Sequence, residues 1–141
     1  MAVFEGNSNR AKTEVFPYDL DLRGFPDGIA QFILEKYRHV KGNLYIDRGY
    51  NLKLPEGLFI EGNLELSGSC IQALPRGLTV CGDLYLSRTL FVWTLPENLS
   101  VGGNLYVMDS QLDGQELPET ISVGGCVIDS NYLYDLGGEK S

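Results

Sequence analysis

The stretch LPEGLFIEGNLELSGSCIQA, residues 54–73, states a pattern that the chain repeats several times. The dipeptide Leu-Pro recurs at intervals of 20, 21 and 22 residues, beginning at Leu54, Leu74, Leu95 and Leu117. A glycine follows the same spacing, two positions after a β-branched residue in each copy: Gly42, Gly62, Gly82, Gly103 and Gly125. Self-similarity with a period of this size indicates a solenoid in which each repeat forms one coil.

Alternation within each repeat predicts the shape of the coil. Residues 58–66 place Leu58, Ile60, Gly62, Leu64 and Leu66 on one face of an extended chain, which we expect to point inward. A strand of this length cannot remain straight if the coil closes within one repeat, and glycine permits a sharp corner. Gly62 and its equivalents are therefore predicted corners, each between two short strands that pair in parallel with those of neighbouring coils.

A variable return segment leads from the second strand of each coil to the next Leu-Pro, and each return should supply one inward apolar side chain. The predicted residues are Leu52, Ile71, Phe91, Leu112 and Leu133, with Trp93 as an additional large residue. The fold class is therefore mainly β: a short parallel β-solenoid of about five coils of 20–22 residues over residues 40–136.

The segments outside the repeats have different patterns. Residues 1–15 lack periodicity and are predicted to form a loose arm, and residues 137–141 a frayed tail. Residues 16–39 should form an N-terminal cap that starts with a short strand or a degenerate first repeat. The main element of this cap is an amphipathic helix over residues 28–38, with Asp27 positioned to cap it. Its predicted apolar face consists of residues at helical spacing: Ile29, Phe32, Ile33 and Tyr37.

Composition excludes several classes of protein. The chain has 141 residues and 43% hydrophobic content, which is sufficient for one packed domain. It contains no long uncharged apolar run and no basic start followed by an apolar stretch, so we expect neither a membrane span nor a signal peptide, and a cytoplasmic location. Three cysteines without metal-type spacing and a single histidine predict no disulfide framework, no metal and no cofactor.

The negative charge is concentrated in the second half of the chain. The net charge is −8, and residues 89–141 contain eight acidic residues against one base, Lys140. An acidic surface disfavours direct binding to nucleic acid or to an anionic membrane and favours a basic protein partner. Solubility alone would also explain such a charge.

The segments LELSGSCI, LYLSRTLF and LYVMDSQL resemble the leucine-rich-repeat skeleton L-x-L-x-x-N-x-L, with Ser69, Thr89 and Ser110 at the asparagine position. The repeated LPxxL resembles secreted bacterial leucine-rich-repeat effectors, and LPxxLxVxGxLxL resembles the repeat arrays of phage and prophage proteins. The chain departs from the effector pattern by its VxG element and its shorter return. It also has no catalytic domain after the repeats, so the resemblance does not imply the ubiquitin-ligase activity of some effectors. The resemblance does imply that the L-x-L strand surface binds partner proteins.

The outward residues of these strands should stack into columns from coil to coil. The predicted columns are Asn43, Asn63, Asp83 and Asn104; Tyr45, Glu65, Tyr85 and Tyr106; and Asp47, Ser67, Ser87 and Met108. Tyrosine gives large, rigid contact area at low entropic cost, which is typical of protein-binding surfaces. The same columns could instead stabilise the parallel strands through stacking and amide ladders.

Together these features predict a non-enzymatic protein-binding module. A more specific form of this prediction is a small phage-type inhibitor that acts in the host cytoplasm and covers the nucleic-acid-binding surface of a host protein. Two alternatives are a carbohydrate-binding β-solenoid, in which Glu65 and Asp83 could provide acid/base chemistry on a sugar, and a structural or self-assembling unit. The sequence does not determine the oligomeric state. The predicted partner-binding residues are Asn43, Tyr45, Asn63, Glu65, Asp83, Tyr85, Asn104, Tyr106, Met108, Asp109, Asp113, Glu116 and Glu119.

Overall fold

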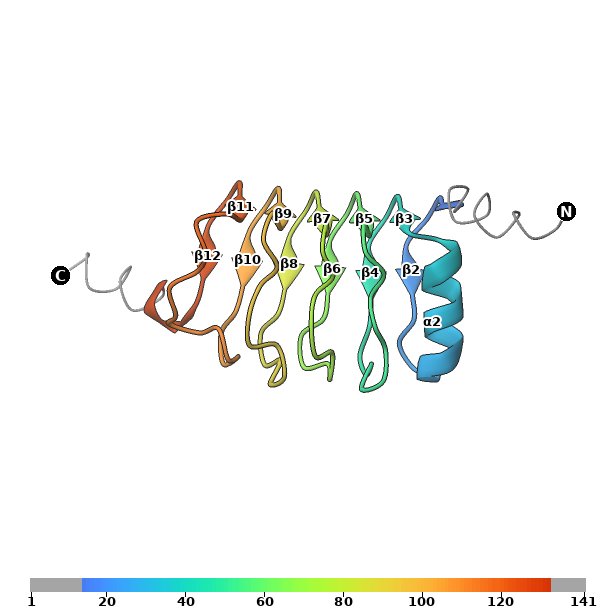
Figure 1. The fold of residues 1–141 in the computed structure, drawn as a ribbon, viewed down its shortest axis with the longest axis horizontal. Helices are drawn as coiled ribbons and strands as arrows, with labels where there is room; N and C mark the ends of the chain where they lie inside the picture. Colours follow the sequence, from blue (N-terminus) through green and yellow to red (C-terminus); the bar gives the residue numbers. More distant parts are fainter. Residues whose placement is uncertain (1–13, 133–141) are drawn as a thin grey trace, which may run out of the picture.

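The structure, a computed structural model, describes residues 14–132 and is a parallel β-solenoid. Each coil gives one two-residue strand to each of two six-stranded parallel sheets (Figure 1). The odd sheet contains β1 (Val15–Phe16), β3 (His39–Val40), β5 (Phe59–Ile60), β7 (Thr79–Val80), β9 (Ser100–Val101) and β11 (Ser122–Val123). The even sheet contains β2 (Leu20–Asp21), β4 (Leu44–Tyr45), β6 (Leu64–Glu65), β8 (Leu84–Tyr85), β10 (Leu105–Tyr106) and β12 (Val127–Ile128). The predicted fold class is confirmed.

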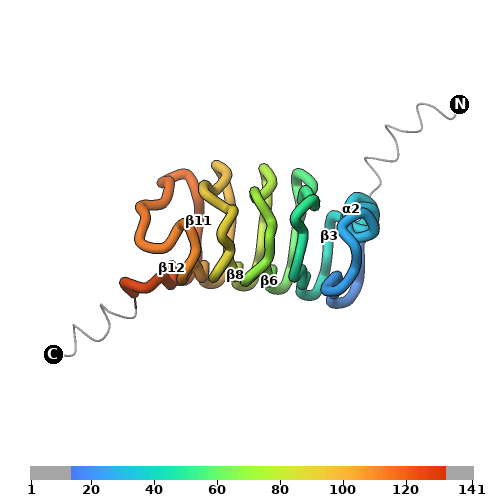
Figure 2. Tube along the Cα trace, turned by 90° about the horizontal axis from the view of Figure 1, so that it is seen from below, coloured from blue at the N-terminus to red at the C-terminus, as the bar shows by residue number. Residues whose placement is uncertain are grey.

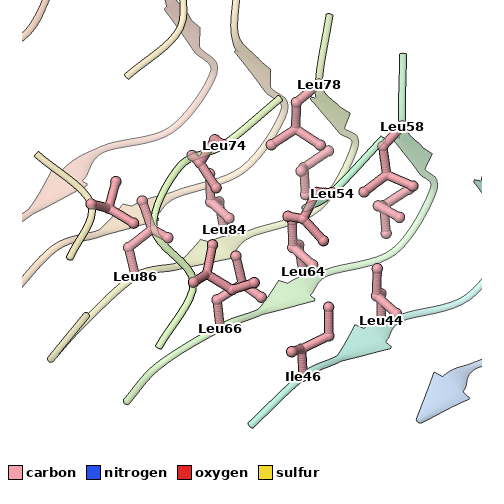
Figure 3. Close-up of a cluster of buried hydrophobic side chains, with 14 of the residues drawn as sticks. Leu44, Ile46, Leu54, Leu58, Leu64, Leu66, Leu74, Leu78, Leu84 and Leu86 are labelled. Atoms are coloured by element: carbon pink, nitrogen blue, oxygen red, sulfur yellow. The ribbon is translucent and has the colours of Figure 1, made fainter. Parts of the chain in front are cut away.

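The core is a set of leucine ladders between the two sheets (Figure 3). Leu44, Leu64, Leu84 and Leu105 pair in register along the even sheet and are fully buried. Leu58 and Ile60 are also fully buried, as the alternation predicts. Each such side chain contributes about 1.5–3 kcal/mol of transfer free energy on burial. A single coil could not bury both of its faces, so stability depends on stacking.

The corner glycines are required because successive coils approach each other closely. A Cβ atom built on Gly82 would overlap the Oδ1 atom of Asn63 and lie 2.8 Å from the carbonyl oxygen of Gly62. Equivalent overlaps occur at Gly42, Gly62, Gly103 and Gly125. The predicted corners are therefore confirmed, and their cause is the space between coils, since none of these five glycines is among the residues with positive φ.

The N-terminal segment joins the same stack. Strands β1 and β2 pair in parallel with β3 and β4, which favours the degenerate first repeat over an isolated strand. Helix α2 (Asp27–Lys36) follows β2 where other coils have a return, and covers the N-terminal end of the stack (Figures 1 and 2).

The helix is present as predicted, and Ile33 of the predicted apolar face packs against the core, with Tyr37 half-buried at the C-cap. The other two residues of that face and the predicted cap are wrong. Ala30 and Leu34 are buried, whereas Ile29 and Phe32 are 52% and 72% exposed. The small Ala30 side chain lets the helix pack closely on the core, which turns the larger residues outward. Pro26 occupies the N-cap position without a side-chain hydrogen bond. The Asp27 carboxylate instead accepts hydrogen bonds from the amides of Gly49 (3.2 Å) and Asn51 (2.8 Å) in the next coil.

The return segments, named here by the strand they follow, lie along one edge of the stack: the β4 return (residues 47–53), β6 return (67–73), β8 return (87–94) and β10 return (108–116). Leu52, Ile71 and Leu112 are buried as predicted, but Phe91 is exposed and Val92 is buried in its place. The buried residue is the fifth of the β6 and β10 returns but the sixth of the β4 and β8 returns, where one more residue precedes it. Trp93 is 62% exposed.

The hydroxyl residues at the predicted asparagine position stabilise the start of each return. Thr89 is fully buried and its Oγ1 donates to the carbonyl of Leu86 (2.6 Å), and Ser110 Oγ donates to the carbonyl of Val107 (2.7 Å). Ser69 is also buried. The carbonyls of Leu86 and Val107 each also accept a hydrogen bond from the backbone amide of the same residue, so the hydroxyl adds a second hydrogen bond that fixes the turn.

A helical turn begins at residue 130. Leu133, the frayed tail expected at residues 137–141 and most of the expected arm at residues 1–15 lie outside the described residues. Within residues 14–132, no helix has the length and apolar character needed to cross a membrane.

Candidate binding surface

The outer face of the even sheet carries the predicted tyrosine column. Tyr45, Glu65, Tyr85 and Tyr106 are register partners on adjacent strands, and all four are half-buried. The column continues to Asp21 at one end and Ile128 at the other. The strand-to-strand register therefore produces the surface, because one residue of every two-residue strand points outward.

Tyr85 and Tyr106 form a rigid stack. Their ring centroids are 4.6 Å apart and their planes differ by 7°. Parallel rings on adjacent coils direct their faces along the long axis of the solenoid, towards each other, so that ring edges and hydroxyl groups face the solvent.

Both hydroxyl groups are also hydrogen-bonded to side chains of the neighbouring asparagine and aspartate column. Tyr85 donates to Asp83 Oδ2 (3.3 Å), and Tyr106 accepts from the Asn104 amide (3.3 Å). Desolvation by burial and the negative charge of Asp83 raise the pKa of the Tyr85 phenol. Tyr85 is therefore a neutral hydrogen-bond donor at physiological pH.

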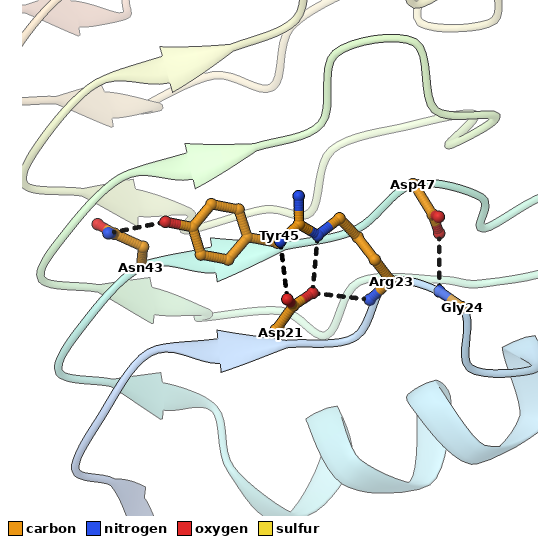
Figure 4. Close-up of polar contacts among 6 residues, drawn as sticks. All are labelled: Asp21, Arg23, Gly24, Asn43, Tyr45 and Asp47. Carbon is orange, nitrogen blue, oxygen red and sulfur yellow. Dashed lines mark hydrogen bonds and ion pairs between the residues drawn. The ribbon is translucent and has the colours of Figure 1, made fainter.

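At the N-terminal end of the face, an ion pair between Arg23 and Asp21 packs against the ring of Tyr45 (Figure 4). The Arg23 guanidinium lies over the Tyr45 ring, 4.7 Å from its centroid, and donates to both carboxylate oxygens of Asp21 (2.8 and 2.7 Å). These hydrogen bonds from Arg23 lower the pKa of Asp21 to about 2. Asn43 donates to the Tyr45 hydroxyl (3.1 Å), and Asp47 accepts from the amide of Gly24 (3.2 Å).

The asparagine and aspartate column forms a polar ladder between coils. Asn43 Oδ1 accepts from the amide of Asn63 (2.7 Å), and Asn63 Oδ1 accepts from the amide of Asp83 (2.8 Å). The same bond links Asp83 to Asn104 (2.7 Å), Asn104 to Cys126 (2.9 Å) and, at the first step, Asp19 to Asn43 (2.8 Å). This column satisfies the amide that follows each corner glycine, so its members have a structural role at least.

The acidic residues predicted to assist binding lie in the β10 return and the turn after it, beside the sheet and outside its outer face. Asp109, Glu116 and Glu119 are exposed, whereas Met108 and Asp113 are half-buried. Asp113 accepts hydrogen bonds from the Ser130 hydroxyl (2.6 Å), the Ser130 amide (3.0 Å) and the Asp109 amide (2.8 Å). Burial alone would raise the pKa of Asp113, but these hydrogen bonds outweigh it and hold the pKa below the ordinary value.

Two features of the surface were missed in the sequence. The first is Arg23, which no repeat pattern places above Tyr45; its i, i+2 spacing from Asp21 on an extended segment was the available signal. The second is a group of exposed apolar side chains on the β4 and β8 returns: Tyr50, Leu90, Phe91 and Trp93.

The candidate catalytic pair is engaged in structural hydrogen bonds. Glu65 Oε1 accepts from the amide of Ser67 (2.9 Å), and the two Asp83 oxygens accept from the amide of Asn104 and the hydroxyl of Tyr85. Among residues 14–132, no three His, Cys, Asp or Glu side chains gather so as to hold a metal ion. Comparisons with protein-family models, curated proteins and solved structures gave no match.

Proposed function

We propose that the chain is a non-enzymatic protein-binding module whose partner contacts the outer face of the even sheet. The observation that supports this proposal is the fixed row of Tyr45, Tyr85 and Tyr106, each held by a stacked ring or guanidinium and by a hydrogen bond from or to its hydroxyl. Side chains that are already ordered lose little conformational entropy when a partner binds.

The orientation of the rings favours a protein over a carbohydrate partner. A sugar stacks on the face of an aromatic ring, but the inner faces of Tyr85 and Tyr106 cover each other. One face of Tyr45 lies against Arg23. What faces outward is a strip of ring edges, hydroxyls and carboxylates, which fits the mixed polar and apolar surface of a protein.

In its sharper form, the proposal is that the partner surface is basic and normally binds nucleic acid, so that the chain acts as an inhibitor. Glu65 lies within the face, Asp83 accepts a hydrogen bond from Tyr85 of that face, and Asp109 is exposed on the β10 return beside it. The resemblance of the LPxxLxVxGxLxL repeat to phage proteins supports the same interpretation.

The test is recovery of partners from lysate with the tagged chain, followed by measurement of affinity with each purified partner. The Tyr45→Ala, Tyr85→Ala, Tyr106→Ala triple variant should lose most of the affinity. A triple variant of outward residues on the odd sheet, His39→Ala, Phe59→Ala and Thr79→Ala, is the matched control and should bind as the native chain does. Equal affinity of the tyrosine variant and the native chain would refute the proposed surface.

The inhibitor form makes a separate prediction about association kinetics. Attraction between opposite charges is screened over about 8–10 Å at physiological ionic strength, so the association rate should fall as salt is raised. Neutralising Asp109, Asp113, Glu116 and Glu119 should slow association more than it accelerates dissociation. A rate that is independent of salt would eliminate the basic partner while leaving the tyrosine face as the site.

A further inference from the structure

The edge formed by the returns carries a second surface that is independent of the tyrosine face. Tyr50 and Phe91 are 58% and 42% exposed, and their ring centroids lie 6.3 Å apart, edge to face, across the intervening β6 return. Trp93, at 62% exposure, is the largest apolar side chain on this edge. Exposed aromatic side chains that cluster in this way mark an interaction site more often than single ones do.

A groove lies on the same edge. It has a volume of about 750 Å³ and is lined by segments 50–56 and 72–76, with Glu35 of helix α2 at one side. Lys53 and Gln72 each follow a buried return residue, and both line the groove. Trp93 follows the buried Val92 in the same way, so it occupies the next position of that column, immediately beyond the groove.

The charges on this edge change sign along its length. The β4 return carries exposed Arg48 and Lys53 beside exposed Asp47, a net charge of +1, and the groove is also lined by Glu35 and Glu56. Arg76 and Arg88 are exposed farther along, after the β6 return and on the β8 return. The β10 return carries exposed acidic residues, Asp109 and Glu116. Among the described residues of the β10 return there is no basic residue. The edge is therefore weakly basic from the β4 return to the β8 return and acidic at the β10 return.

We propose that this edge is the interface of an antiparallel homodimer in which Trp93 of each copy enters the groove of the other. A two-fold axis between the β6 and β8 returns would place Trp93 opposite Gln72 and Arg76 of the partner. The same axis would place the acidic β10 return of one copy opposite Arg48 and Lys53 of the other. A two-fold interface must be self-complementary, and an edge with a net positive β4 return and an acidic β10 return fulfils that condition when it is reversed. An indole that meets Arg76 also gains a cation–π contact.

The dimer would leave both even sheets uncovered, because the returns and the tyrosine face are different sides of the coil. Each dimer would then present two tyrosine faces. The dimer does not depend on the tyrosine face: the tyrosine variants test partner binding, whereas Trp93→Ala and Arg48→Glu test dimerisation. Asp109 and Glu116 enter both proposals, so neutralising them would affect association with a basic partner and dimerisation together.

The experiment is sedimentation velocity over a range of micromolar concentrations, combined with the emission spectrum of Trp93, the single tryptophan of the chain. We expect a dimer that forms with concentration, weakens with salt, and shifts the tryptophan emission to shorter wavelength as the indole leaves water. Trp93→Ala should raise the dimer dissociation constant by about thirtyfold or more, as expected for a central aromatic anchor.

Charge variants provide a second test that does not depend on the tryptophan. Arg48→Glu should weaken the dimer, and adding Glu116→Arg to it should restore dimerisation. Phe32→Ala, which removes an exposed aromatic residue from helix α2, is the matched control and should leave the dimer unchanged. A monomer at all concentrations overturns the proposal, and so does a dimer that persists in both Trp93→Ala and Arg48→Glu.

Discussion

Replacing Gly82 with alanine should destabilise the solenoid far more than the loss of one backbone conformer would. The added Cβ would overlap Asn63 Oδ1 and approach the Gly62 carbonyl oxygen to 2.8 Å. Asn63 would have to release the Asp83 amide, with which it forms a 2.8 Å hydrogen bond. An unsatisfied amide costs about 1–3 kcal/mol. Displacement of the Gly62 backbone adds an overpacking cost of about 1–3 kcal/mol, so the total loss should be about 2–6 kcal/mol.

The assay is urea unfolding of Gly82→Ala, Asn63→Ala and the double variant. Asn63→Ala removes both the hydrogen bond and the atom with which the new Cβ collides, so the double variant should be more stable than the sum of the single losses predicts, by about 1 kcal/mol. Gly28→Ala is the control, because a Cβ at this exposed helical position meets no atom within 4 Å. It should stabilise the chain by up to about 1 kcal/mol. A loss below about 0.5 kcal/mol for Gly82→Ala, or strict additivity with Asn63→Ala, would refute the coupled-corner explanation.

Three further predictions concern the core, the returns and acid stability. Leu84→Ala should lower the free energy of unfolding by about 2–5 kcal/mol, whereas Tyr85→Ala should cost clearly less in the same denaturation assay; equal losses would contradict the assignment of faces. Val92→Ala should destabilise the chain more than Phe91→Ala, and the reverse order in thermal unfolding would contradict the longer β8 return. Because the pKa of Asp113 lies below its unfolded value of 3.8, its hydrogen bonds stabilise the fold above that pH, and this stability is lost as pH falls through the folded-state pKa. Asp113→Asn should therefore flatten the acid limb of a plot of urea midpoint against pH, and an unchanged limb would rule out this role.

The period of the repeats was enough to predict the sheets, their register and the buried leucines. Leu-Pro and the corner glycine recur together, so the phase of Leu64, and hence of Leu84 and Leu105, follows from residue spacing alone. The columns on the outer face follow from the same phase. Their contacts do not, since Asn63 Oδ1 meets the Asp83 amide only because successive coils lie one strand spacing apart at the corner.

Segments with little periodicity gave the wrong predictions. In the β8 return, either Phe91 or Val92 could have filled the inward position, and the choice depended on a turn that is one residue longer. In helix α2, Ala30 was passed over because its small side chain gives a weak apolar signal, although its size is what permits close packing. The exposed position of Trp93 depends on the same turn, so the residue pattern alone did not predict that Trp93 would lie on the surface beside the groove.

The polar ladder also determines how such a chain can gain or lose coils during evolution. Each coil supplies one carboxamide or carboxylate acceptor to the coil after it and one amide donor to the coil before it. A duplicated segment of one period would therefore bring a complete set of these hydrogen bonds with it. Differences of one or two residues are taken up in the returns, since successive corner glycines lie 20, 20, 21 and 22 residues apart and every ladder bond is kept. Cys126 stands at the next acceptor position of the ladder, and a thiol is a weak acceptor. Cys126→Asn is the substitution that would prepare this end of the array to accept an additional coil.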